Sequence, residues 1–113
     1  MNSQYITEVA VYLRPSVISQ ECVEIGKIVK CDEDGTAQCT IDPNNEATIK
    51  RICDFFPEFT REKVIRIMEW ARHDFEYTMR KERQIGDKSA FANLIRKREN
   101  IIQYGCPRVR KAS

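Results

Sequence analysis

Two β-type runs joined by a turn signal constrain the fold of this chain more than any other feature of its sequence. Apolar and polar residues alternate in residues 22–31 and 36–41, and Asp34-Gly35 between them supplies the positive φ that a tight hairpin turn needs. Alternation gives this hairpin one apolar face, made by Ile28, Ala37, Cys39 and Ile41. The sequence therefore predicts an antiparallel hairpin with one face directed at a core.

The hydrophobic period changes after the hairpin. Asp42-Pro43 is a strong helix start, and apolar residues then recur at helical spacing over residues 43–55 and again, after the cap Thr60, over 61–83. Residues 5–13, which are rich in β-branched and aromatic residues, predict a central strand. Two shorter segments follow the helices, a helix near 89–95 and a closing strand near 100–104.

These elements predict one α+β domain over residues 1–106. Its four-stranded antiparallel sheet has the two main helices packed on one face, and residues 107–113 form a basic, mobile tail. Gly26 inside the second strand indicates a bulge or a close approach of two backbones. A single sheet with open edges and one uncovered face predicts a protein partner or a dimer.

The sequence lacks the signatures of the common catalytic and metal sites. It contains no glycine-rich phosphate loop, nucleophile elbow, zinc-binding helix or calcium loop, so we expect no cofactor, metal ligand or catalytic residue. Five cysteines without a CxxC pair predict reduced, mostly buried thiols. Apolar runs far shorter than the roughly 20 residues of a membrane span, and no visible signal segment, predict a cytoplasmic protein that does not contact a membrane.

Charge is distributed unevenly along the chain. Residues 1–60 carry a net charge of −5, whereas residues 61–113 carry +7. A basic half of this kind can neutralise the phosphates of a nucleic acid or contact an acidic protein, and it can also be a solvated helix face followed by a basic tail. Nucleic acid is therefore one possible partner.

Both ends of the chain carry motifs of a known pattern. A first strand leads through Pro15 to residues 21–26, Glu-Cys-Val-Glu-Ile-Gly, and Phe91-x-x-Leu94 leads to Arg-Glu and a β-like run. This arrangement resembles an uncharacterised bacterial domain family that is associated with loci encoding HipA-like kinases. The resemblance covers residues 5–30 and 90–108, and it implies a closing strand before residue 105 and a toxin-like kinase as partner.

The same resemblance implies a polar site. In the family pattern an arginine stands at the position of Tyr12 and an asparagine at that of Glu24, and these two would be its likeliest members. What this chain retains is Glu21 and Gly26 at a strand entry and Arg98-Glu99 before the closing strand, which can form an ion-paired seam or simply maintain the fold. The candidate binding residues are Glu21, Glu24, Gly26, Arg98, Glu99 and Arg108.

A second interpretation groups residues 36–41, 43–56 and 61–83 into one unit. A strand followed by two helices resembles the ribbon-helix-helix repressors, whose paired strands from two subunits enter the major groove of DNA. Gln38 and Thr40 would then face the bases. The acids at 32–34 weigh against this interpretation, because they repel phosphates and because the turn lets the strand pair within its own chain.

Three functional hypotheses follow. The first is a small non-enzymatic binding protein, a partner or modulator of a toxin-like kinase or another protein, from a bacterium or phage. The alternative is a ribbon-helix-helix transcriptional repressor that binds DNA. The third is an enzyme acting on nucleic acid or nucleotide, with Glu24, His73 or Glu99 as acid or base.

Overall fold

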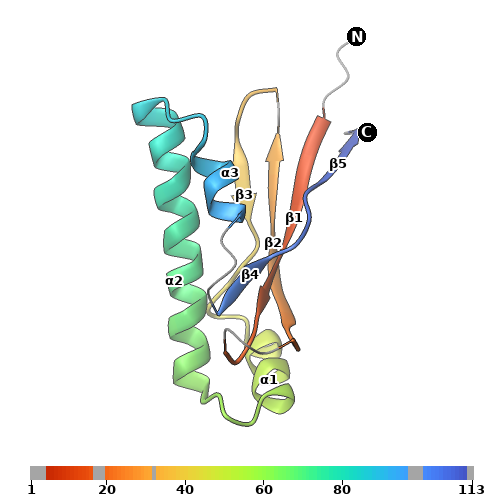
Figure 1. Ribbon diagram of the computed structural model, residues 1–113. Coiled ribbons are helices and arrows are strands. Elements are labelled where there is room, and N and C mark those ends of the chain that lie inside the picture. The colour runs from red at the N-terminus through yellow and green to blue at the C-terminus, as the bar shows by residue number, and fades with distance from the viewer. Residues whose placement is uncertain (1–4, 17–19, 32, 97–100, 112–113) are drawn as a thin grey trace.

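The computed structural model describes residues 5–16, 20–31, 33–96 and 101–111. It shows an α+β fold, as the sequence predicted, with a five-stranded antiparallel sheet and three α-helices (Figure 1). Along the chain the elements are β1 (Tyr5–Leu13), β2 (Val23–Cys31), β3 (Ala37–Cys39), α1 (Glu46–Phe55), α2 (Arg61–Arg80), the π-helical turn η1 (Lys81–Ile85), α3 (Ala90–Ile95), β4 (Ile102–Tyr104) and β5 (Arg108–Lys111).

β1 lies at the centre of the sheet and pairs on both sides. On one side the order is β1, β2, β3, and on the other side β4 and β5 share the same edge of β1. β4 pairs with the C-terminal part of β1, with Leu13 opposite Ile102, and β5 pairs with its N-terminal part, with Glu8 opposite Arg108. The C-terminal strands β4 and β5 therefore pair directly with the N-terminal strand β1.

The core lies between one face of the sheet and the helices. Val9, Val11 and Leu13 are fully buried on that face of β1, and α2 packs against it with a buried stripe that includes Val64 and Met68. The π-helical turn and α3 close the same layer. There Lys30 of β2 pairs with Glu82 at 3.0 Å, and its ammonium group lies 4.8 Å from the ring centre of Phe91.

Gly26 was predicted to mark a bulge or a close approach, and it lies at both. The register with β1 shifts between Val11, opposite Gly26, and Tyr12, opposite Glu24, so that Ile25 is an extra residue on β2. On the core side, a Cβ atom on Gly26 would lie 2.7 Å from Cγ1 of Ile41 and 2.9 Å from its backbone nitrogen. Glycine is thus required because the Ile41 backbone passes directly beside it.

The structure corrects the predicted start of the first helix. The sequence placed the cap at Asp42, but α1 begins at Glu46 with Asn45 as its N-cap, whose side chain accepts from the Thr48 amide. Asp42 instead accepts from the Asn44 amide and forms a turn ahead of the helix. The second cap, Thr60, is confirmed, because its hydroxyl accepts from the Lys63 amide.

Two further predictions were wrong. Arg108–Lys111, which was assigned to a mobile tail, forms the fifth strand and lies against β1. The cysteines are free thiols, but none of the five is buried: Cys22 and Cys106 are exposed and the other three are half-buried. Burial nevertheless raises the pKa of the Cys39 thiol.

Every helix in the described ranges is too short or too polar to cross a membrane.

Candidate binding groove

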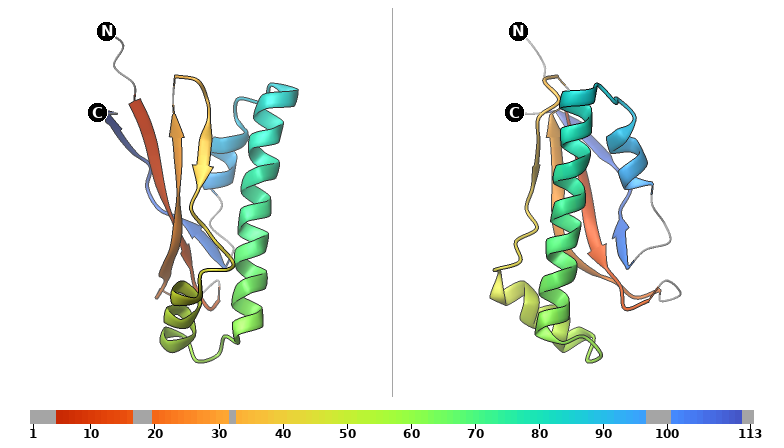
Figure 2. Two further views of the ribbon diagram at one scale, coloured as in Figure 1. Left: turned by 180° about the vertical axis from the view of Figure 1, so that it is seen from behind. Right: turned by 90° about the vertical axis from the view of Figure 1, so that its left-hand side faces the viewer.

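One face of the sheet is left uncovered by the described helices. In the view from behind (Figure 2, left), β5, β1, β2 and β3 lie side by side with no helix drawn across their length, and α1 lies at their lower end. Because strand side chains alternate, Glu8, Ala10 and Tyr12 of β1 point to this face. Their cross-strand partners on β2 and on β4 and β5 point the same way.

A groove of about 360 Å³ lies in the middle of this face. Its base is made by two residues with almost no side chain, Ala10 of β1 and Gly105, whose amide donates to the Ala10 carbonyl at 2.8 Å. Larger side chains surround this base on three strands and on the link between β4 and β5. The lining consists of Glu8, Ala10, Tyr12, Glu24, Lys27, Gly105, Cys106 and Arg108.

Two irregularities of the sheet border the groove. On one side, the extra residue of β2 lies between Glu24 and Lys27, so both of these side chains reach the open face. On the other side, Tyr104 lies opposite Val11 and Arg108 opposite Glu8, so three residues from Gly105 to Pro107 face only two residues of β1. Bulges of this kind interrupt pairing and redirect side chains, and proline and glycine in the link suit this role.

The groove contains two carboxylates and two cations that are not paired with one another. Glu8 lies opposite Arg108, and Glu24 and Lys27 lie on the neighbouring strand. In the described part of the chain, none of these four side chains forms an ion pair or a side-chain hydrogen bond. They are therefore available for charged groups of either sign on a ligand.

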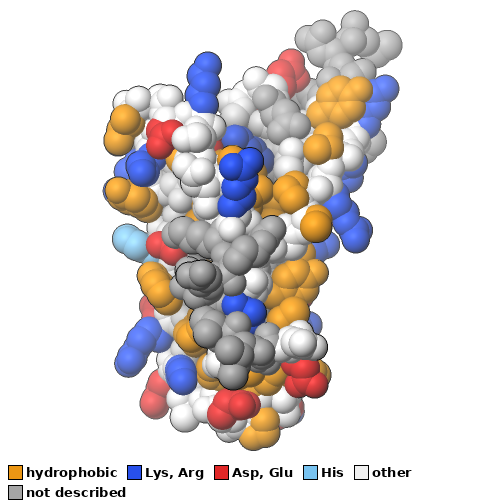
Figure 3. All heavy atoms as spheres, in the orientation of Figure 1, with side chains coloured by type: hydrophobic (Ala, Val, Ile, Leu, Met, Phe, Trp, Pro, Cys, Tyr) orange, Lys and Arg blue, Asp and Glu red, His pale blue; other side chains and the backbone are white. Residues whose placement is uncertain are grey.

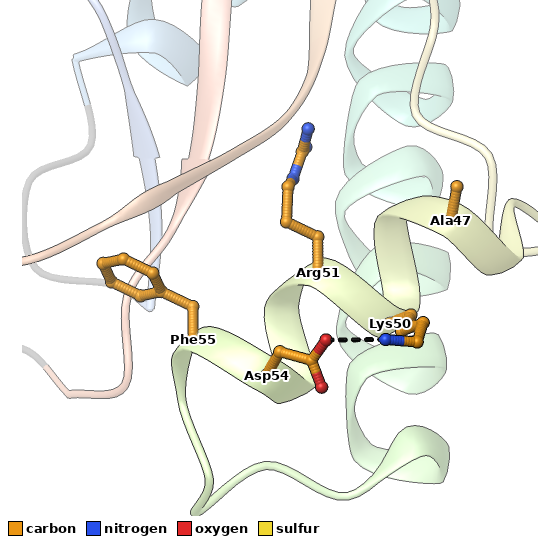
Figure 4. A pocket seen from close by; sticks show the side chains of 5 residues that line it. All are labelled: Ala47, Lys50, Arg51, Asp54 and Phe55. Carbon is orange, nitrogen blue, oxygen red and sulfur yellow. Dashed lines mark hydrogen bonds and ion pairs between the residues drawn. The ribbon is translucent and has the colours of Figure 1, made fainter.

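Helix α1 supports the β2 side of the groove. Arg51 donates from its guanidinium to the backbone carbonyl of Glu24 at 2.6 Å. The same helix carries a shallow hollow on its exposed face, lined by Ala47, Lys50, Arg51, Asp54 and Phe55 (Figure 4). Lys50 and Asp54 form an ion pair at 2.9 Å, and in that view Arg51 points away toward the strands. All three charged side chains of this hollow thus already have a partner within the chain.

Only part of the predicted polar site comes together. Glu24 and Arg108 line the groove, whereas Gly26 belongs to the core side and Glu21, an exposed residue before β2, does not line it. Arg98 and Glu99 lie outside the described residues. Tyr12 and Glu24, two of the positions at which the resemblance implies other residues, are direct cross-strand partners in the groove.

Apart from Glu24, the described residues of the other two hypotheses lie elsewhere. Gln38 and Thr40 are exposed at the β3 end of the sheet, and β3 pairs within the chain, with Val29 opposite Gln38 and Ile28 opposite Cys39. His73 is exposed on α2, on the helical side of the core, so it does not meet Glu24 on the open face. Among the residues that the structure describes, no group of three His, Cys, Asp or Glu side chains is placed to hold a metal ion.

Sequence reasoning missed six lining residues: Glu8, Ala10, Tyr12 (as a groove residue), Lys27, Gly105 and Cys106. A signal was present in β1, because its two-residue period assigns Glu8, Ala10 and Tyr12 to the side opposite Val9 and Val11. Residues 105–108 line the groove only because β5 pairs with β1, and the sequence did not predict a strand at β5.

A protein-family comparison gives one finding. A family model described as "Protein of unknown function (DUF3037)" matches residues 9–112, a range that includes every groove residue except Glu8. Searches of curated proteins and of solved structures found no match. The expectation of an uncharacterised family is thus confirmed, while the association with kinases stays a prediction.

Proposed function

Because this chain belongs to the DUF3037 family, whose description assigns no activity, we propose a function from the groove itself: a non-catalytic binding protein. In this proposal the uncovered sheet face holds a segment of a partner protein that carries both acidic and basic side chains. The proposal depends on one observation, the gathering of Glu8, Glu24, Lys27 and Arg108 around a hollow in which none of them is paired with a described residue.

The composition of the groove supports binding over catalysis. The described lining contains no histidine, serine or threonine, and the Cys106 thiol is exposed at the surface. Charges of both signs fit a polypeptide segment better than a phosphate backbone, because Glu8 and Glu24 would repel phosphates. The half-buried ring of Tyr12 adds apolar contact area of the kind common at protein interfaces.

The resemblance at the two ends of the chain suggests a class of partner. Members of the resembling family are associated with loci of HipA-like kinases, so a toxin-like kinase of the same organism is the first partner to test. Binding on the open face would cover the sheet surface that the helices leave exposed.

Site-specific photo-crosslinking in the native host tests this proposal. A benzoyl-phenylalanine replaces Cys106 at the edge of the groove, and the same photoreactive residue replaces Arg66 on α2 as the matched control. We expect a protein adduct from position 106 and not from position 66. The adduct should be lost when Ala10→Phe fills the groove or when Lys27→Glu and Arg108→Glu reverse its cations.

Four outcomes are decisive. Loss of the adduct in both groove variants, with an unchanged thermal melting curve, supports the proposal, and a kinase in the adduct supports the predicted partner. An adduct that survives both variants overturns the groove as the binding site. Binding only to duplex DNA, with affinity falling steeply as salt rises, overturns protein binding in favour of the repressor.

A further inference from the structure

The outer edge of β3 carries backbone groups that the sheet does not use. Cys31 donates to the Thr36 carbonyl at 2.8 Å and Thr40 donates to the Lys27 carbonyl at 2.9 Å, so positions 36, 38 and 40 are the ones that bond to β2. In an antiparallel ladder the intervening residues, Ala37 and Cys39, direct their N–H and C=O groups to the other side. No further strand follows β3 on this side of the described sheet.

Only part of this edge is covered by the neighbouring helix. Arg72 of α2 donates to the carbonyls of Cys39, at 3.4 Å, and Ile41, at 2.7 Å. The N–H and C=O of Ala37 and the N–H of Cys39 have no backbone or side-chain partner in the part of the chain that the structure describes. Figure 2 (left) shows β3 as the strand nearest α2, with this edge turned toward the helix.

A second groove, of about 270 Å³, runs between this edge and the last turns of α2. Ala37 lies at its strand side, and Phe75 and Met79, which are almost buried, form its apolar base. Arg80 and Arg83 line its open side and are both exposed. A strand added to β3 would thus meet hydrogen-bonding groups, an apolar surface and cations together.

The charge of this groove selects the occupant. Glu76 also lines it, but its carboxylate is held by Arg72 at 3.3 Å, whereas Arg80 and Arg83 form no ion pair with any described residue. The edge therefore presents two guanidinium groups that are not paired within the described structure, and such groups bind carboxylates well. If a second copy of this chain paired through β3, its residues 36–41 would bring no carboxylate to these arginines, because they carry no charge.

From these observations we propose that the outer edge of β3 binds an extended acidic segment of a partner protein as an additional strand. Main-chain hydrogen bonds to Ala37 and Cys39 supply the pairing, the Phe75 and Met79 surface takes an apolar side chain, and Arg80 and Arg83 select acidic residues. This site lies on the opposite edge of the sheet from β5 and shares no lining residue with the groove proposed above. The two proposals can therefore fail separately.

Amide hydrogen exchange with a defined peptide tests it. The probe is an acetylated and amidated heptapeptide, Glu-Ile-Glu-Val-Glu-Ile-Glu, and its lysine counterpart is the charge control. We expect exchange at Ala37 and Cys39 to slow by roughly tenfold or more on saturation with the acidic peptide. Gln38 is the internal control, because its amide already pairs with β2 and should not change.

Substitutions sharpen the test. Arg80→Glu with Arg83→Glu should weaken peptide binding by roughly tenfold or more, whereas Arg66→Glu, on the same helix but away from the edge, should leave it unchanged. Equal binding of the lysine peptide, or no slowing at Ala37 and Cys39, overturns the proposal. Protection of these two amides that rises with protein concentration in the absence of peptide also overturns it, because a second copy then occupies the edge.

Discussion

Gly26 shows how one residue determines the path of two segments of this protein. It faces Val11 across the sheet, while the backbone of Ile41, just before α1, passes beside its Cα atom. The missing side chain brings β2 and the segment after β3 into contact at the point where the extra residue Ile25 also changes the register. Glu24 and Lys27, on either side, reach the groove as a result.

Replacing Gly26 by alanine should therefore destabilise the fold. The added methyl group would lie within 3 Å of both the side chain and the backbone nitrogen of Ile41, and relief requires the backbone to move. We expect a loss of about 1–3 kcal/mol in the free energy of unfolding, measured by urea denaturation.

Gly105→Ala is the matched comparison for this substitution. Its added methyl group would come no closer than 3.2 Å, to Cε2 of Tyr12, which is the end of a side chain and can shift. A smaller loss is expected there. Equal stability of wild type and Gly26→Ala would contradict the close approach described here.

The β2–β3 hairpin is the element whose turn chemistry is most completely visible. Gly35 has a φ of 75°, and the Asp34 carboxylate accepts from both the amide, at 2.9 Å, and the hydroxyl, at 2.7 Å, of Thr36. These bonds, the backbone one first, lower the pKa of Asp34 from its ordinary value of 3.8. The charged form is thus the one that the folded turn favours.

This lowered pKa gives a pH dependence with a defined sign. Ionised Asp34 stabilises the folded state above pH 3.8, and this contribution is lost as the pH falls through its lower folded pKa. Asp34→Ala should lower the melting temperature near neutral pH, and the difference from wild type should shrink in acid. Glu33→Ala, in the same turn but without a hydrogen bond among the described residues, should show little difference at either pH.

Local sequence patterns predicted most elements but not all of their limits. β1 was assigned its observed bounds because a run rich in β-branched and aromatic residues ends at Leu13, two residues before Pro15. The start of α1 was misplaced because Asp42 and Asn45 are both good caps, and only the turn that Asp42 closes with Asn44 decides between them. β5 carries no pattern to detect, since its four residues are all exposed and only their backbone pairs.

The groove could be predicted only in part for a related reason. The alternation of β1 indicates which of its side chains face away from the core, but their neighbours on β2 and β5 depend on register. Each register contains one extra residue. Gly26 indicated the one near Ile25 only as a bulge or a close approach, and no local rule places the one near Cys106. The lining is therefore a property of the assembled sheet.

β5 completes one edge of the sheet and makes it basic. Figure 3 shows lysine and arginine side chains along this edge, and Arg108 also enters the groove. The strand buries no side chain, so its contribution comes from backbone pairing with Tyr5–Glu8.

Deleting residues 108–113 should give a folded but less stable protein. The truncation should lower the free energy of unfolding by on the order of 1–2 kcal/mol. This is the net effect of losing the backbone hydrogen bonds of four paired residues and no longer having to order them, while β4 and the core remain. Thermal unfolding measures the loss, and Arg110→Ala with Lys111→Ala separates it from the removal of charge. A truncated protein as stable as wild type would mean that the segment does not pair.

The pairing of β1 with β5 also affects how the protein can be joined to others. Tyr5 is the register partner of Lys111, so the first and last described residues leave the sheet next to each other. A short connector between these ends, with a new opening at the Asp34-Gly35 turn, would yield a circular permutant that keeps every strand pair. By the same geometry the whole domain can be inserted into a surface loop of another protein without stretching either chain.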